Sequence, residues 1–279
     1  MALTKVLIAA KTYPALSSKY DELVCTAGFT EDGRWIRIFP IPFRKLEYEQ
    51  RYKKYDWVEI DLEKNHKDFR PESYKPVTIE REFRTVGHLD TGVDKSWKER
   101  KNIVLQNVHR CKKSLIEEAK DKKLNTSLAV FKPKEIKDFI YTPVEREWDK
   151  AKLDALRAKA NQGLLFQTDE NPFDVVQKLP FKFQYIFLDE NNISSTLMIE
   201  DWELGVLYWK MLAKHEGNEA KACLEVRKKY FDDFAQTKDL YLFLGTTYEN
   251  HIKNAPNPFV IIGTFHPKFA VVNPQLALF

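Results

Sequence analysis

Residues 58–63, VEIDLE, alternate strictly between apolar and acidic side chains, and no other stretch constrains the fold as much. Successive side chains of an extended backbone point to opposite sides, so a period of two is typical of a half-buried strand. The apolar positions are Val58, Ile60 and Leu62, and the acidic positions are Glu59, Asp61 and Glu63. The sequence therefore predicts a sheet here, with a hydrophobic core on one of its sides.

The first third of the chain contains further strand patterns. Residues 5–11 are predicted to be a strand around the apolar run VLIAA, and residues 23–39 contain two further strand patterns around the turn signal Glu-Asp-Gly. The second region is therefore predicted to be a hairpin, and another strand is expected near residues 77–83. Together these segments predict a β-rich domain over residues 1–92, built as a small mixed sheet or a barrel.

Helical and strand patterns mix in the remainder. Ser96 and Glu99 match a capping box, and apolar residues at helical spacing follow, which predicts one long helix over residues 96–123. The apolar runs LYLFLGTT and FVIIGTF predict strands that are buried on both faces. We expect an α+β protein in which a helix-containing α/β domain spans residues 93–270 and a peptide tail spans residues 271–279.

Composition narrows the class of protein. A hydrophobic fraction of 43% argues for a packed core. Three cysteines lie far apart, which argues against a disulfide framework and against a cysteine-rich zinc site. No apolar run approaches the roughly 18 residues of a membrane span, and the N-terminal residues do not resemble a signal peptide. A cytoplasmic location without membrane partners is expected.

Common nucleotide and nucleophile motifs are missing from the sequence. It contains no GxxxxGK[ST], no GxGxxG after a strand and no GxSxG. No cofactor is therefore expected from motifs, and the sequence leaves open whether the protein is an enzyme.

The segment from residue 34 to residue 54 mixes basic and aromatic side chains. Cationic groups can neutralise phosphates while exposed rings stack on bases. The candidate nucleic-acid contacts are Arg34, Trp35, Arg37, Arg44, Lys45, Arg51, Lys53 and Lys54. Acidic neighbours dilute this charge and the whole chain carries only +4, so a mixture of core aromatics and solvated cations remains the alternative.

The acidic face of residues 59–63 offers a different chemistry. Clustered carboxylates can hold Mg²⁺ for phosphodiester hydrolysis, so the candidate catalytic residues are Glu59, Asp61, Glu63 and His66. A solvated strand face gives the same pattern and is the simpler interpretation. The neighbouring loop NHKDFRPES is dense in polar groups that can bind a phosphate or transfer protons, although loops are polar in general.

The last five residues resemble a known recognition peptide. Gln275, Leu276, Leu278 and Phe279 match the Gln-Leu-x-Leu-Phe motif by which bacterial DNA polymerases and repair proteins dock on the replicative sliding clamp. Leucine and phenylalanine side chains would fill an apolar cleft, and the glutamine amide would hydrogen-bond at its rim. A terminal strand that packs on the protein's own core is the alternative.

The body resembles an uncharacterised group of bacterial proteins with no established activity. The stretches that carry this resemblance are KTYPALSSKYDELVCTAG, GRWIRIFPIPFR, KDFRPES, LFLGTT and PFVIIGTF. Together with the tail, the resemblance implies a bacterial DNA-associated protein that is recruited to the sliding clamp, in DNA maintenance or in defence against foreign DNA. Two alternatives remain open, a metal-dependent nuclease and an RNA-binding protein with a β-barrel core.

Overall fold

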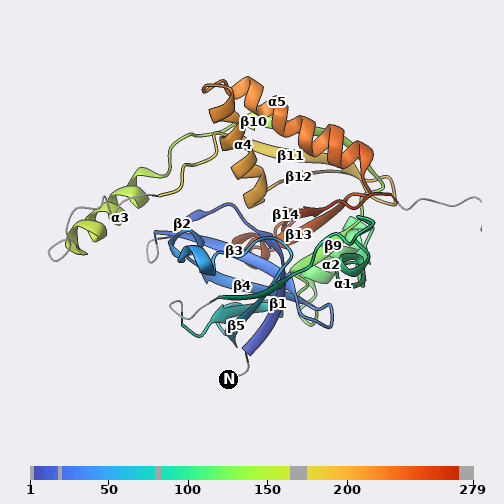
Figure 1. The fold of residues 1–279 in the computed structure, drawn as a ribbon, viewed down its shortest axis with the longest axis horizontal. Coiled ribbons are helices and arrows are strands. Elements are labelled where there is room, and N and C mark those ends of the chain that lie inside the picture. Colours follow the sequence, from blue (N-terminus) through green and yellow to red (C-terminus); the bar gives the residue numbers. More distant parts are fainter. Residues whose placement is uncertain (1–2, 18–20, 79–82, 164–174, 270–279) are drawn as a thin grey trace, which may run out of the picture.

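The first strands of the chain close into a barrel, which occupies the lower half of Figure 1. The computed structural model describes residues 3–17, 21–78, 83–163 and 175–269. The ring runs β1-β3-β4-β6-β5 and closes through pairing of β5 with β1. The strands of this part are β1 (Leu3–Lys11), β2 (Ala15–Ser17), β3 (Asp21–Phe29), β4 (Trp35–Ile41), β5 (Asp56–Lys64), β6 (Ser73–Pro76) and β7 (Arg84–His88). β2 extends the barrel wall beside β3, and β7 does so beside β5.

Alternation along the strands fills the barrel. Val58, Ile60 and Leu62 of β5 are buried, and the residues between them are more exposed, as the sequence predicts. They pack against Val6 and Ile8 of β1 in one apolar cluster. The predicted hairpin over residues 23–39 is confirmed as β3 and β4. The strand expected near 77–83 is only partly testable, because residues 79–82 lie outside the described residues.

The connectivity of this barrel identifies its architecture. If β1, β3, β4, β5 and β6 are numbered one to five, their ring order is one-two-three-five-four, and only β4 and β6 pair in parallel. This is the order of the five-stranded Greek-key barrel known as the OB-fold. Two short 3₁₀ helices, η1 (Phe43–Lys45) and η2 (Tyr48–Gln50), lie between the third and fourth of these strands.

Two further sheets and several helices form the rest of the chain, which confirms the α+β class. One sheet has the order β14-β13-β9-β8, and the other has the order β10-β11-β12. Their strands are β8 (Val108–His109), β9 (Leu128–Phe131), β10 (Glu135–Pro143), β11 (Phe181–Leu188), β12 (Ser194–Met198), β13 (Tyr241–Thr246) and β14 (Phe259–Phe265). The runs LYLFLGTT and FVIIGTF become β13 and β14, and every residue of β13 is buried.

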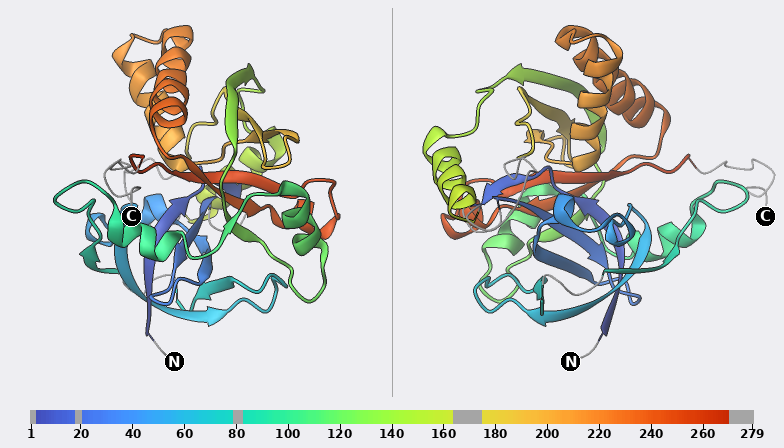
Figure 2. Two further views of the ribbon diagram at one scale, coloured as in Figure 1. Left: turned by 90° about the vertical axis from the view of Figure 1, so that its right-hand side faces the viewer. Right: turned by 60° about the vertical axis from the view of Figure 1, so that its left-hand side comes forward.

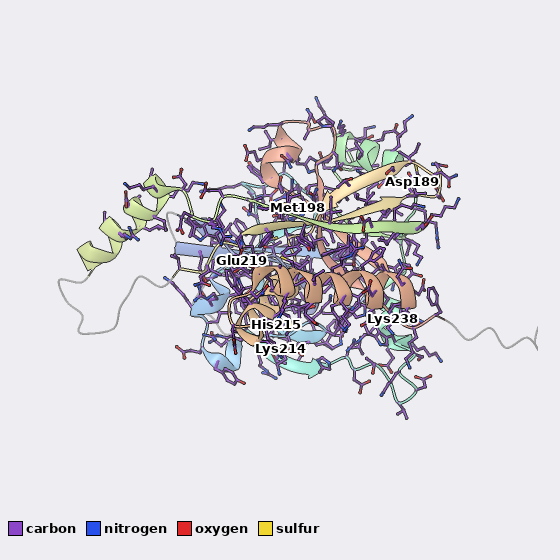
Figure 3. The ribbon with its side chains drawn as sticks, turned by 90° about the horizontal axis from the view of Figure 1, so that it is seen from above. Asp189, Met198, Lys214, His215, Glu219 and Lys238 are labelled. Atoms are coloured by element: carbon purple, nitrogen blue, oxygen red, sulfur yellow. The ribbon has the colours of Figure 1, made fainter. Side chains whose placement is uncertain are left out.

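Helices cover the β10-β11-β12 sheet. Helix α4 (Trp202–Lys214) and helix α5 (Glu219–Arg227) pack against each other. α5 continues into the π-helical segment η4 (Lys228–Ala235), and together they form a rod that runs from near Glu219 to near Lys238 in Figure 3. Helix α3 (Lys150–Gly163) projects from the left side of the molecule in Figure 1. Within the described residues, no helix is long and apolar enough to cross a membrane.

The prediction of one long helix over residues 96–123 is wrong. The structure has instead two short helices, α1 (Lys98–Val104) and α2 (Lys112–Lys120), which are separated by β8. β8 pairs in parallel with β9, and this pairing holds the intervening backbone extended. Trp97 precedes α1 with a positive φ of 61°, so Ser96 does not cap the helix as the sequence pattern suggests. Sheet pairing therefore overrides the local helical periodicity.

The β14-β13-β9-β8 sheet packs directly on the outside of the barrel. Leu7 and Ala27, which point outward from β1 and β3, share a buried cluster with Leu128, Phe243 and Ile262 of this sheet. Consequently the outer face of β1, β3 and β4 is an internal interface between the two parts of the chain. The views in Figure 2 show this sheet lying between the barrel and the helical layer.

Candidate functional site

The loop between β5 and β6 organises the best-formed polar site among the described residues. It begins with a turn in which the Asn65 carboxamide accepts from the backbone of Lys67, and the Asn65 carbonyl accepts from Asp68. Asp68 in turn accepts from the backbone of Arg70. Local hydrogen bonds of this kind shape a loop without help from regular secondary structure. They direct Asp68 and Arg70 inward, while His66 and Lys67 are exposed.

Asp68 and Arg70 form a buried ion pair. The Arg70 Nε lies 2.8 Å from one Asp68 oxygen and Nη2 lies 2.5 Å from the other, so the contact is bidentate. Ser73 donates a further hydrogen bond to Asp68. Burial alone would raise the pKa of the Asp68 carboxyl, but the hydrogen bonds and charge of Arg70 outweigh it, and the pKa falls below its usual range. Both side chains therefore stay charged.

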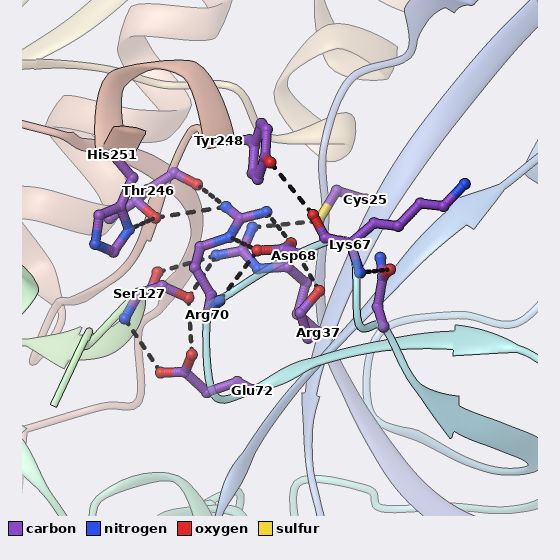
Figure 4. Close-up of polar contacts among 12 residues, drawn as sticks. Cys25, Arg37, Lys67, Asp68, Arg70, Glu72, Ser127, Thr246, Tyr248 and His251 are labelled. Carbon is purple, nitrogen blue, oxygen red and sulfur yellow. Dashed lines mark hydrogen bonds and ion pairs between the residues drawn. The ribbon is translucent and has the colours of Figure 1, made fainter. Parts of the chain in front are cut away.

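Arginine and carboxylate groups of this loop reach into the second part of the chain (Figure 4). Arg70 Nη1 donates to the carbonyl oxygen of Thr246 at the end of β13, at 2.8 Å. Glu72 accepts from the backbone and the hydroxyl of Ser127, at 3.1 and 2.9 Å. Arg37 of β4 donates to the Ser127 carbonyl at 3.0 Å. This interdomain cluster, Arg37, Asp68, Arg70, Glu72, Ser127, Thr246 and His251, ties the barrel to the sheet beside it.

His251 completes the cluster from helix α6 (Tyr248–Ile252). Its Nδ1 lies 3.0 Å from the Thr246 hydroxyl, and its Nε2 lies 2.6 Å from the carbonyl oxygen of Ala119. The carbonyl can only accept, so Nε2 carries a proton and the neutral ring accepts from Thr246. Burial lowers the pKa of His251 below its ordinary value, which is consistent with this neutral form.

Acidification is expected to weaken the fold through His251. An unfolded histidine has a pKa of about 6.5 and binds a proton that folded His251 resists, so stability falls as the pH drops through about 6.5. His251→Gln keeps a donor for Ala119 and removes this titration. Urea midpoints at about pH 7.5 and 5.5 should therefore differ more for the natural protein than for the variant. Equal acid sensitivity of the two proteins would contradict the assignment, since every other histidine is common to both.

Above the interdomain cluster the surface opens into a cleft of about 1360 Å³. The β5–β6 loop forms one wall, and Tyr248 of α6 closes one side by donating from its hydroxyl to the Lys67 carbonyl at 3.2 Å. The residues that line this cleft are Phe39, Pro40, Glu63, Lys64, Asn65, His66, Lys67, Asp68, Arg70, Lys75, Pro76, Val77, Thr78 and Tyr248. Both parts of the chain therefore contribute to it.

Among the charged side chains that line this cleft, cations outnumber carboxylates. The lining contains the side chains of Lys64, Lys67, Lys75 and Arg70, against the carboxylates of Glu63 and Asp68. Glu63 pairs with Lys75, and Asp68 pairs with Arg70, so both carboxylates are neutralised locally. Lys64 donates to backbone carbonyls of the loop, and its partial burial lowers its pKa. An anionic ligand would find an excess of positive charge here.

The structure scatters the nucleic-acid contacts predicted between residues 34 and 54. Arg34 is exposed at a hairpin turn, where it pairs with Asp32. Trp35, Arg37 and Lys54 instead face the second part of the chain, where Trp35 packs on Phe243 and Lys54 donates to the Thr264 carbonyl.

Arg37 is only 4% exposed, so its guanidinium does not lie on the surface. The remaining candidates gather around η1 and η2, where Arg51 donates to the carbonyl oxygens of Leu46 and Arg44. That group, which does not line the cleft, consists of Arg44, Lys45, Arg51 and Lys53.

The proposed acidic site lies on the outward face of β5. Glu59 is 3.8 Å from Arg84, and Glu63 is 2.5 Å from Lys75, so cations already accompany two of the three carboxylates. Asp61 also has interactions within the protein. In the part of the chain that the structure describes, no group of three histidine, cysteine or carboxylate side chains is arranged to hold a metal. His66 lies in the β5–β6 loop and not on this strand face, and it lines the cleft together with Glu63.

Gln275, Leu276, Leu278 and Phe279 lie outside the described residues, so the structure does not place the predicted docking peptide. Conversely, sequence reasoning passed over Lys64, Lys67, Lys75 and Tyr248 as binding groups. The dense polar loop NHKDFRPES was the available signal for the first part of this site. Tyr248 is about 180 positions away from that loop, and nothing in its local sequence indicates the contact with Lys67.

Two different family models match this chain, and the boundary between them lies where β8 begins. Residues 2–106 match the family described as domain of unknown function DUF8758, and residues 108–279 match the one described as domain of unknown function DUF8757. Among curated proteins the comparison finds no significant match. The second family covers more than half of the chain, so this protein belongs to the DUF8757 family and carries a DUF8758 domain before it.

Proposed function

We propose that this protein binds nucleic acid through the cleft beside the β5–β6 loop and is recruited to the bacterial sliding clamp by residues 275–279. The observation that carries the first half is the cationic cleft with aromatic side chains at its edge. Phosphates are held by lysine and arginine, and bases stack on aromatic rings, so this combination suits a nucleic acid better than a small metabolite.

The proposed recruitment to the clamp rests on the sequence Gln275-Leu276-Ala277-Leu278-Phe279. Average residue usage makes a chance match of its four fixed residue types at one defined position rarer than about one in ten thousand. A short peptide that orders on binding gives modest affinity and rapid exchange, which suits a clamp shared by many proteins. Docking there would bring the cleft to DNA during replication or repair, or when foreign DNA is copied.

RNA binding without clamp recruitment is the second candidate, and it rests on the barrel alone. The ring order of β1, β3, β4, β6 and β5 is that of the OB-fold, a barrel that binds oligonucleotides in many proteins. Fold alone does not establish function, so this candidate rests on analogy. Stronger binding to RNA than to DNA of the same sequence, without affinity for the clamp, would favour it over clamp recruitment.

Binding to nucleic acid is expected to weaken with salt, because phosphate contacts release counterions. Each contact contributes a slope of about −0.7 for a single strand in a plot of log affinity against log salt. Lys67→Ala removes an exposed cation of the cleft and should lower the magnitude of that slope by about 0.7. Fluorescence anisotropy with single-stranded DNA, single-stranded RNA and duplex DNA measures this slope.

Lys221→Ala on α5 is the matched control, because it removes another exposed lysine from a helix far from the cleft. It should leave the slope unchanged. No binding to any of the three nucleic acids at low salt would rule out the proposed nucleic-acid function.

A further inference from the structure

One face of the barrel is closed to any ligand. In OB-folds the face of the second and third strands, here β3 and β4, commonly contacts the oligonucleotide. In this protein Phe29 and Trp35 of those strands pack against Phe243 of the neighbouring sheet, and Arg37 is buried beneath Ser127. A nucleic acid therefore has to engage a different part of the barrel. The cleft meets that condition, because it lies at the C-terminal end of β4, where Phe39 and Pro40 line it, and beside the β5–β6 loop, which joins the fourth and fifth strands of the OB-fold order.

Two exposed aromatic rings stand beside the cleft. Phe69 is 45% exposed and Tyr248 is 44% exposed, and their ring centroids lie 6.1 Å apart with a 44° angle between the planes. Phe69 also meets the buried ring of His251 edge-on at 4.9 Å. The Tyr248 hydroxyl is fixed by the carbonyl oxygen of Lys67. Both rings are therefore held in position while a large part of each remains accessible.

Rings that are fixed but exposed suit an unpaired base. Stacking of one base on an aromatic side chain contributes about 1–3 kcal/mol, and it needs a base whose face is free. Duplex DNA covers the faces of its bases, so the two rings gain little from it. The cleft volume of about 1360 Å³ also exceeds the roughly 300–1,000 Å³ of small-molecule pockets, which indicates an extended ligand.

We propose that the cleft binds a single-stranded segment of nucleic acid, with an unpaired base on Tyr248 and Phe69 and phosphates against Lys64, Lys67 and Lys75. This inference rests on the proposed nucleic-acid function and specifies its substrate. The site is composite, because the DUF8758 barrel supplies the cations and Phe69, and the DUF8757 part supplies Tyr248. Neither part alone carries the whole site.

The test separates the contribution of the Tyr248 ring from that of its hydroxyl by comparing Tyr248→Ala with Tyr248→Phe. Anisotropy of fluorescent oligothymidine, oligouridine and a duplex of equal length is measured with the full chain. Tyr248→Ala should weaken single-strand binding by about 5- to 100-fold, which corresponds to the loss of one stacked base. Tyr248→Phe keeps the ring and should stay within about twofold of the natural protein. The ratio of the oligothymidine and oligouridine affinities separates DNA from RNA as the source of the strand.

Tyr48→Ala is the matched control, because Tyr48 is 79% exposed on η2 and does not line the cleft. It should leave every affinity unchanged. Phe69→Ala provides a second variant if Tyr248→Ala does not fold by circular dichroism. Equal binding of single strand and duplex, with no effect of either ring deletion while Lys67→Ala still weakens binding, would overturn the single-strand inference and leave the proposed function standing. No binding to any nucleic acid would overturn both.

Discussion

Replacing Asp68 with alanine is expected to lower the free energy of unfolding by about 3–5 kcal/mol, because it leaves the Arg70 charge buried without its partner. Both side chains of the pair are about 5% exposed, so water cannot replace the lost carboxylate. The same change removes the acceptor of the Ser73 hydroxyl. Since whole domains are stable by only about 5–15 kcal/mol, this is a large fraction of the total. Urea unfolding followed by circular dichroism measures it.

Glu63→Gln is the control for this prediction. It also breaks a salt bridge of the same loop region, with Lys75, but both of those side chains are more than 40% exposed. Exposed pairs contribute about 0–1 kcal/mol, so this variant should remain close to the natural protein. Asp68→Asn, which keeps the shape and removes the charge, should fall between the two. If Asp68→Ala cost no more than Glu63→Gln, the interdomain cluster would not be a structural link.

The buried Asp68–Arg70 pair also positions the residues that line the cleft. Arg70 holds the β5–β6 loop against Thr246, which immediately precedes the α6 region that contains Tyr248. The exposed groups of the cleft are therefore positioned by buried charges directly beneath them (Figure 4). A ligand that meets preformed groups loses less entropy on binding, so the cost of ordering the site is met during folding.

Strand positions were predictable where a local pattern determines them. Val58, Ile60 and Leu62 alternate with acids, and this pattern needs no knowledge of the partner strands. The two apolar runs that become β13 and β14 were equally clear. The hairpin of β3 and β4 follows from its turn residues. Each of these signals is local, because it depends on residues that are close together in the sequence.

Features that depend on distant pairing were not predictable. The helix expected over residues 96–123 is interrupted because Val108 pairs with Val130 of β9. Closure of the barrel requires β1 to pair with β5, about fifty residues later, and nothing local specifies that ring.

The residues of the candidate site were also not predictable from local sequence, because distant contacts bring them together. Arg37 resembles a surface cation in the sequence but lies beneath Ser127, ninety residues away in the chain. Tyr248 likewise reaches the β5–β6 loop from the far end of the sequence. Burial and tertiary contact therefore decide which of the basic and aromatic residues are free to bind.

Replacing both Leu278 and Phe279 with alanine is expected to abolish the proposed recruitment to the sliding clamp. Full burial of one such side chain contributes about 1.5–3 kcal/mol. Losing two of them should therefore weaken binding by at least about a hundredfold, at 1.4 kcal/mol per factor of ten. Ala277→Ser changes the variable position of the motif and should bind as the natural protein does.

Surface plasmon resonance of the natural protein and both variants on the purified clamp of the host measures this recruitment directly. Circular dichroism melting of the same samples controls for folding. We expect that the natural protein and Ala277→Ser bind, that the double alanine variant does not, and that all three melt alike. If the natural protein does not bind the clamp, or if the double variant binds equally well or unfolds, residues 275–279 are not a clamp-docking peptide.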